Sequence, residues 1–393
     1  MLPLGCSPKK SASRDGDAPL VRVRLLAGVD RLSLSLDQPP TIVTDGGSTR
    51  KKLGTSPGQT VTVTLAGDGW TVNGVAAGAG TMEILPATDG SAAINNMPYR
   101  GSFRFVPAGA GRFDVINDVD VESYLQGVLA KELFADWHPE AYRAQAVIAR
   151  TYALYEVKTG PENRHWDLHP DERSQVYGGM KAETEKASAA VAATRGAVVT
   201  WGPSGEEKIF KAYFSSCCGG VSASAGDAFK EAVIPPLDAR YNGNTCSMST
   251  RYNWGPVTLR KDDLAKRFRA WGEKNGHPLA KITGIASIDI AMTNAYGRPR
   301  RYTITDTAGQ QYVISSEQTR WAINTTPQGG VTVFSGFFKP VDAGDSIQLV
   351  EGHGFGHGVG ACQWCMQGRA LAGEGFESIV LKSYPQSKVL LAY

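Results

Sequence analysis

The sequence contains no long hydrophobic run and no strong excess of charge of either sign. It has no stretch of about 18 apolar residues, so no membrane-spanning helix is predicted. Its 393 residues include 41 basic and 38 acidic side chains, which gives a net charge of +3. Nucleic-acid-binding proteins usually carry a larger positive excess. The balance therefore does not favour nucleic acid as a partner, whereas it is compatible with an acidic polysaccharide.

The first residues also lack the segments that normally precede a lipidation site. The stretch Leu2-Pro-Leu-Gly-Cys-Ser7 resembles the end of a bacterial lipoprotein signal, in which Cys6 carries the lipid. The basic and apolar segments of a signal peptide are absent before it. Two interpretations stay open: the start codon truncates a signal, or the likeness is chance. Residues 7–19 are small and polar and are predicted to form a flexible tether.

Cysteine is scarce. The chain has six: Cys6, Cys217, Cys218, Cys246, Cys362 and Cys365. An even number in an exported chain permits disulfides, but the sequence does not reveal which cysteines pair. If Cys6 carries lipid, five remain and one of them is unpaired. Buried free thiols, which pack as small hydrophobic groups, are the alternative.

Glycine, in contrast, is abundant, with 45 residues beside 21 prolines, and this predicts many turns. Residues 20–113 show short alternating runs such as Leu32-Ser-Leu-Ser-Leu36, which are typical of strands. Residues 114–393 mix helical and strand patterns. The sequence thus predicts an α+β fold, with a β-rich N-terminal region followed by a mixed α/β region. The helices expected in the second region are 121–133, 139–157, 182–194, 259–275 and 367–372.

One carboxylate in this second region lies in an unusual position. Glu132 follows Val128 by four residues on the helix predicted over 121–133, so it shares the apolar face of Leu125 and Val128. Partial burial raises the pKa of a carboxyl group and makes it a general acid near neutral pH. The alternative is structural: Glu132 extends to solvent at the helix end or pairs with Arg150.

Four ordered motifs resemble the SpoIID/LytB family. The first covers Val115–Leu133 and continues through Trp137–Ala141 and Ala144–Ala153. Gln175-Val-Tyr-Gly-Gly179 is similar to the glutamine–tyrosine loop of that family. The other two are similar to its serine-rich strand end (Tyr213–Gly220) and its C-terminal glycine loop (Gly356–Trp364). Together the motifs extend from about Tyr99 to Ser383, whereas the first 100 residues match weakly.

The resemblance implies an activity and a set of site residues. It implies a peptidoglycan lytic transglycosylase that cleaves between N-acetylmuramic acid and N-acetylglucosamine and leaves 1,6-anhydro ends, with Glu132 as the catalytic residue. The region 114–393 would be the catalytic domain, and its central helix pair would form the substrate groove. No cofactor is implied. The expected substrate-binding residues are Gln145, Arg150, Tyr152, Gln175, Tyr177, Ser215, Ser216, His357 and Gln363. For several of these residues, above all Gln145 and Arg150, the alternative to substrate binding is a structural role in bracing the fold.

Some members of the family hold zinc in the loop before the glutamine–tyrosine motif. Where their cysteine, histidine and cysteine are expected, this chain has His169, Arg173 and Ser174. Because zinc needs three or four thiolate, imidazole or carboxylate ligands, this departure predicts no metal there. Cys362 and Cys365 form a C-x-x-C pair, which alone is weak support for zinc or redox chemistry.

The resemblance leaves three functions open. The first is the enzyme, located in the cell envelope outside the cytoplasm and acting on peptidoglycan glycan strands. The second is a non-catalytic enhancer that binds glycan and stimulates a separate cell-wall amidase. The third is a structural envelope protein that uses its β-rich half as a docking module. Sporulation is the setting for which the family is named, and no residue of the chain ties it to that setting.

Overall fold

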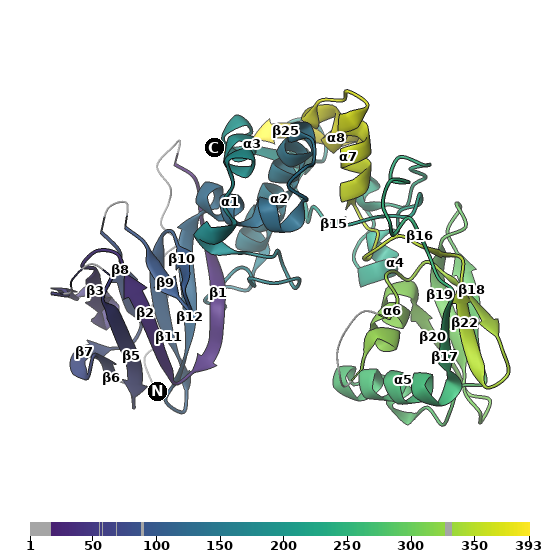
Figure 1. The fold of residues 1–393 in the computed structure, drawn as a ribbon, viewed down its shortest axis with the longest axis horizontal. Helices are drawn as coiled ribbons and strands as arrows, with labels where there is room; N and C mark the ends of the chain where they lie inside the picture. The colour runs from purple at the N-terminus through teal and green to yellow at the C-terminus, as the bar shows by residue number, and fades with distance from the viewer. Residues whose placement is uncertain (1–16, 55, 57, 68, 88–89, 327–331) are drawn as a thin grey trace. The chain divides into compact units, whose positions relative to one another are not determined.

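The computed structural model describes residues 17–54, 56, 58–67, 69–87, 90–326 and 332–393, and these form two compact units (Figure 1). The first unit comprises the described residues up to Ala135, with Ala149–Val198 and Leu390–Tyr393; the second comprises Asp136–Ile148 and Val199–Val389. Cys6 and most of the predicted tether lie outside the described residues. The division predicted from the sequence, 20–113 and 114–393, is a different one and stays a prediction. The mixture of helices and strands confirms the α+β class.

The first unit contains two six-stranded sheets, ordered β1-β12-β11-β8-β3-β4 and β10-β9-β2-β5-β6-β7. Alternation explains these strands: the buried leucines of β2 and the buried valines of β5 point into one core, and serine and threonine lie between them. The strands are β1 Leu20–Val29, β2 Arg31–Leu36, β3 Thr41–Thr44, β4 Thr49–Lys52, β5 Thr60–Ala66, β6 Gly69–Val72, β7 Val75–Ala79, β8 Met82–Leu85, β9 Ala92–Ile94, β10 Met97–Tyr99, β11 Ser102–Gly109 and β12 Arg112–Asp120.

Strand β12 leads directly into helix α1 (Val121–Glu132). Asp120 ends the strand and caps the helix, because its carboxylate accepts a hydrogen bond from the Ser123 N–H at 3.0 Å. Helix α2 (Pro139–Thr159) starts with proline at its first position, as the sequence predicts. Its residues from Ala144 to Leu154 are all buried. Helix α3 spans Glu185–Ala193 and starts three residues later than predicted, because Thr184 caps it.

The second unit has its own hydrophobic core, in which helices α5 and α6 pack together beside small antiparallel sheets (Figure 1). Its helices are α4 Ala225–Phe229, α5 Lys261–Asn275, α6 Ser316–Asn324, α7 Gln363–Leu371 and α8 Phe376–Ser383. Its strands are β15 Phe214–Ser215, β16 Asn253–Trp254, β17 Val257–Arg260, β18 Ser287–Thr293, β19 Pro299–Thr305, β20 Gln311–Ser315, β21 Lys339–Asp342, β22 Ser346–Val350, β23 Gly352–His353 and β24 Ala361–Cys362.

One further three-stranded sheet has the order β14-β13-β25, with β13 Ala197–Trp201, β14 Lys208–Ile209 and β25 Lys388–Leu391. Four short 3-10 turns complete the described elements: η1 Asp45–Gly47, η2 Gly179–Ala182, η3 Pro235–Leu237 and η4 Pro278–Lys281. Within the described ranges, none of the helices combines the length and the apolar character that crossing a membrane requires.

Two predicted elements of the second unit differ from the structure. The helix expected over 367–372 starts earlier, at Gln363, because the Cys362 sulfur accepts a hydrogen bond from the Cys365 N–H and caps it. The run from Ile209 to Phe214 is divided between the ends of β14 and β15 rather than forming one strand. Strand β15 pairs in parallel with β24, and this aligns Ser215 with Cys362. The serine-rich motif and the glycine loop therefore lie side by side.

Candidate functional site

Glu132 is the last residue of α1, and its side chain is half-buried. Its Oε1 atom accepts a hydrogen bond of 3.2 Å from the backbone N–H of Val176. Val176 lies between Gln175 and Tyr177, so the glutamine–tyrosine motif binds the carboxylate through its main chain. An N–H that points at a carboxylate fixes its orientation whatever side chain the loop residue carries.

Close packing against α1 fixes the position of that loop. Gly127 faces the ring of Tyr177, and a Cβ atom added at Gly127 would lie 2.7 Å from the ring and 3.0 Å from the Gly179 carbonyl oxygen. The Gly178 N–H also donates to the Gly127 carbonyl at 2.9 Å. Only glycine lets the loop approach this closely, one and a half turns before Glu132.

The side chains of Gln175 and Tyr177 are buried and make hydrogen bonds within the first unit. The Gln175 side chain accepts from the Tyr124 hydroxyl at 3.1 Å and donates to the Ala149 carbonyl at 3.4 Å. The Tyr177 hydroxyl donates to Asn117 at 3.1 Å, and only 6% of the residue is exposed. Burial raises the pKa of this hydroxyl, so it stays protonated. These contacts fit the bracing alternative, and a direct role in sugar binding stays a prediction.

Arg150 takes part in a buried ion pair with Glu122. Its Nε and Nη2 atoms donate to the two Glu122 oxygens at 2.9 and 2.7 Å, and Nη1 donates to the Ala197 carbonyl at 3.0 Å. Burial acts to raise the pKa of Glu122, but the hydrogen bonds and charge of Arg150 outweigh it, so the net shift is downward. Arg150 therefore braces α1 against α2 and β13. Tyr152, two residues further along α2, is 7% exposed.

The remaining predicted binding residues belong to the second unit. The Ser215 hydroxyl accepts from the Gly358 N–H at 3.2 Å, and the Ser216 carbonyl accepts from the Trp364 N–H at 3.1 Å. Gln363 is the first residue of α7 and is 6% exposed. Gln145 on α2 is fully buried, and its amide has no hydrogen-bond partner among the described residues.

His357 lies in the glycine loop, with Tyr213 and Phe229 around its ring. Burial lowers the pKa of its imidazole to about 4, so the ring is neutral at pH 7. The Nδ1 atom accepts from the Val359 N–H at 2.9 Å. A neutral ring that accepts at Nδ1 carries its proton on Nε2, which fixes the tautomer.

The loop before the glutamine–tyrosine motif is held by charged and aromatic side chains. Asp167 accepts from Arg22 at Nε and Nη2, at 2.9 and 2.6 Å, and the Arg24 guanidinium lies 3.8 Å from the centre of the Trp166 ring. His165 contacts Asp114 at 2.9 Å. His165 and Asp167 thus already have protein partners.

A different group of residues is suited to a metal. The sulfur atoms of Cys218, Cys246, Cys362 and Cys365 all lie within 4.8 Å of one another, and all four residues are buried. Within the described ranges they form the one set of three or more His, Cys, Asp or Glu side chains close enough to share an ion. Sequence reasoning missed this group because its members come from three separate segments. The C-x-x-C pair was the available signal.

A surface pocket of the first unit lies at the other end of α1. Its volume is about 390 Å³, and Asp120, Ser123 and Met180 are among its lining residues. Twelve residues separate Asp120 from Glu132, which corresponds to about 18 Å along a helix. Glu132 therefore does not lie in this pocket.

Comparisons with known proteins agree with the motifs. A family model described as Stage II sporulation protein, SpoIID, matches residues 109–201. An uncharacterized protein of Brachyspira hyodysenteriae is 30% identical over 305 residues, which cover 77% of this chain and 74% of that protein. The amidase enhancer of Bacillus subtilis is 28% identical over 66% of this chain, but only 39% of the enhancer's length is matched. Stage II sporulation protein D of Bacillus subtilis is 24% identical over 77% of this chain and 82% of its own length.

The matched residues 109–201 include α1 with Glu132, α2 and the glutamine–tyrosine loop that binds the Glu132 carboxylate. By these motifs and relatives, the chain belongs to the SpoIID/LytB family.

Proposed function

We propose that the protein is a peptidoglycan lytic transglycosylase that cleaves the bond between N-acetylmuramic acid and N-acetylglucosamine. The observation that supports this most is the Glu132 carboxylate, which is half-buried at the end of α1 and oriented by the Val176 N–H. A carboxyl group held in one orientation and partly removed from water is suited to general acid catalysis. Residues 114–393 would supply this activity.

A single carboxyl group is sufficient for this reaction. Glu132 in its protonated form donates its proton to the glycosidic oxygen while the bond from that oxygen to the anomeric carbon of N-acetylmuramic acid breaks. The 6-hydroxyl of the same sugar attacks the anomeric carbon, and the Glu132 carboxylate takes the hydroxyl proton. The products are a 1,6-anhydro sugar and a free 4-hydroxyl, and the carboxyl group is protonated again. A hydrolase would need a second carboxylate to act as nucleophile or to activate water.

The other predicted residues would bind and position the glycan. Ser215, Ser216, His357 and Gln363 are proposed to contact sugar hydroxyl and acetamido groups from the second unit. In the first unit, Gln175 and Tyr177 would act indirectly, because they hold the loop whose N–H binds Glu132. Such a protein would act in the cell envelope, outside the cytoplasm.

A relative named amidase enhancer supports a second candidate function. In that case the protein would bind glycan strands without cleaving them and would stimulate a cell-wall amidase. Both candidate functions require glycan binding, but only the first includes glycan cleavage. Glu132 is required by the first and dispensable for the second.

One experiment separates the two candidates. Purified glycan strands without stem peptides are incubated with the wild-type protein, with Glu132→Gln and with Glu185→Gln, a matched change at an exposed position in the first turn of α3. Mass spectrometry then detects anhydromuramyl ends. The enzyme proposal expects these ends from the wild type and Glu185→Gln only. Cosedimentation with glycan and no new ends from any of the three proteins would reject the enzyme and favour the enhancer.

A further inference from the structure

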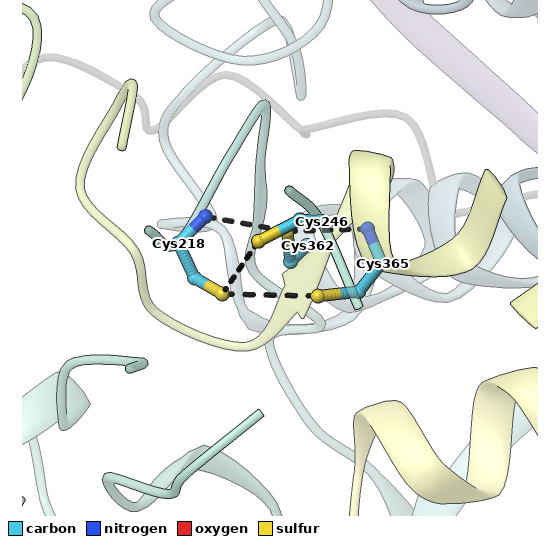
Figure 2. Close-up of side chains that lie close together, drawn as sticks. All are labelled: Cys218, Cys246, Cys362 and Cys365. Carbon is cyan, nitrogen blue, oxygen red and sulfur yellow. Dashed lines mark hydrogen bonds between the residues drawn. The ribbon is translucent and has the colours of Figure 1, made fainter. Parts of the chain in front are cut away.

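Four cysteine thiols of the second unit point toward a common centre (Figure 2). Cys218 follows the serine-rich strand end, Cys246 lies in a turn region, and Cys362 and Cys365 lie at the start of α7. The Cys218 sulfur is 3.7 Å from that of Cys246 and 3.8 Å from that of Cys365. A disulfide would require about 2.05 Å, so no pair is bonded.

These separations match a tetrahedral metal site. Zinc binds thiolate sulfur at about 2.3 Å, and four ligands at the corners of a tetrahedron of that size lie about 3.8 Å apart. The separations of the Cys218 sulfur from those of Cys246 and Cys365, 3.7 and 3.8 Å, agree with this value, and all four sulfurs lie within 4.8 Å of one another. Each of the four residues is at most 3% exposed.

Two of the four sulfur atoms accept hydrogen bonds from protein N–H groups. Cys362 accepts from the backbone N–H groups of Cys218 at 3.2 Å and Cys365 at 3.4 Å. The side-chain amide of Asn242 donates to the Cys218 sulfur at 3.5 Å. Cys362 also caps the nine-residue helix α7, whose N-terminal end carries partial positive charge. Donors around a metal-bound thiolate orient the ligand and stabilise its negative charge.

A buried arginine, Arg298, and a half-buried one, Arg240, lie beside the cluster. Arg298 is 2% exposed, and its guanidinium donates to the Cys218 carbonyl at 3.0 Å and to the Val221 carbonyl at 2.8 Å. Arg240 interacts electrostatically with Cys218 and Cys365. Among the described residues neither guanidinium forms an ion pair with a carboxylate, and Arg298 also interacts electrostatically with Glu317. A buried cation without a counter-charge is costly.

We propose that Cys218, Cys246, Cys362 and Cys365 bind one Zn²⁺ ion as a closed, structural site. Four protein ligands leave no position for water or substrate, so the ion does no chemistry. It joins three segments that are far apart in the sequence. Two of these carry predicted glycan-binding residues, Ser215 and Ser216 beside Cys218, and Gln363 beside Cys362. Zinc is favoured over iron because divalent zinc binds such a site more tightly.

The test is the metal content of the full-length protein purified without chelator. One zinc per chain, and X-ray absorption showing four sulfur ligands at about 2.3 Å, is the expected result. Serine at any one of the four positions is expected to lower the bound zinc from one equivalent to near zero. Cys217→Ser is the matched control, because Cys217 is equally buried and adjacent to Cys218 but is not one of the four.

Several results would overturn the proposal. Wild-type protein without metal and with its thiols oxidised in pairs would show disulfides instead. Bound iron in place of zinc would reject the choice of ion, and zinc lost from Cys217→Ser but retained by one of the four variants would reject the ligand set. Should a serine variant aggregate, the stoichiometry and absorption spectrum of the wild type still decide the proposal. None of these readouts depends on glycan cleavage.

Discussion

The loop before the glutamine–tyrosine motif and the glycine loop of the second unit are both held firmly, but by different chemistry. The first is bound to β1 by the Arg22–Asp167 pair and by backbone hydrogen bonds from Asp167 and Leu168 to the Arg22 carbonyl. The second lies beside a cluster of four thiols and a buried arginine, Arg298. Some members of the family hold zinc in the first loop, where this chain has charged pairs. The cysteines of this chain gather at the second loop instead.

This difference makes each unit sensitive to a different treatment. Substitutions of charged residues should weaken the first unit and leave the bound metal unchanged. Loss of a thiolate should release the bound metal and leave the first unit unchanged. The expected effects below run from the largest to the smallest.

Arg150→Ala should destabilise the first unit most. It leaves the buried Glu122 carboxylate without its main partner, and breaking a buried ion pair costs about 3–5 kcal/mol. Urea unfolding followed by circular dichroism measures the change. Arg143→Ala is the control on the same helix, because the Arg143 side chain is 41% exposed and its ion pair with Glu140 should matter less. A loss below about 1 kcal/mol for Arg150→Ala would show that the pair does not brace α1.

Arg22→Ala should cost about 1–3 kcal/mol, since Asp167 is 2% exposed and keeps only backbone donors. The comparison is Arg173→Ala in the same loop, which removes the exposed pair with Asp171 and should have a much smaller effect on stability. Both are read from urea midpoints. Equal effects of the two substitutions would contradict the idea that the buried pair replaces a metal in holding the loop.

Gly127→Ala should displace the glutamine–tyrosine loop, because the added methyl group meets the Tyr177 ring and the Gly179 carbonyl. Overpacking of this kind costs about 1–3 kcal/mol and should also reduce glycan cleavage through the Val176–Glu132 contact. Thermal unfolding and product formation are both measured. Gly54→Ala, at a position with open space and an ordinary φ, is the control. Unchanged glycan cleavage by Gly127→Ala would show that the position of the glutamine–tyrosine loop does not affect the function of Glu132.

Acid should weaken the second unit at a higher pH than the first. His357 has a folded-state pKa near 4, below its ordinary value of 6.5, so the unfolded chain binds the proton more tightly. The contribution of His357 to the stability of the folded state is present above about pH 6.5 and is lost as the pH falls toward 4. The pKa of Glu122 is lowered from 4.5, so its contribution is lost only below that value.

Unfolding midpoints of wild type and His357→Gln between pH 7 and 5 measure the effect. The wild type should lose stability over this range and the variant should lose less. Parallel curves would contradict the burial of a neutral imidazole.

Local signals in the sequence predicted the elements around Glu132 well. The helix expected over 121–133 ends at Glu132, and Asp120 caps its start through a hydrogen bond to the nearby Ser123 N–H. The alternation in residues 32–36 and 61–65 likewise appears as strands β2 and β5. Such patterns need no knowledge of distant contacts.

Contacts between distant segments were not predictable in the same way. The sequence suggested Arg150 as a partner for Glu132. In the structure the Arg150 guanidinium instead donates two hydrogen bonds to Glu122, which lies 28 residues earlier, and no local pattern in the sequence indicates this pair. The four cysteines span 147 residues, and only the fold brings Cys218 and Cys246 to the C-x-x-C pair. The role of Glu132 itself stays a prediction from resemblance and position.

The rate at which anhydromuramyl ends form from denuded glycan, compared between wild type and Glu132→Gln, tests the central claim most directly. General acid–base catalysis contributes about 10²–10⁴-fold, so the substitution should lower the rate by at least about 100-fold. Circular dichroism of the variant should remain that of the wild type, and Glu185→Gln should retain full activity. Equal rates for the wild type and Glu132→Gln would contradict the assignment of Glu132 as the catalytic acid and base.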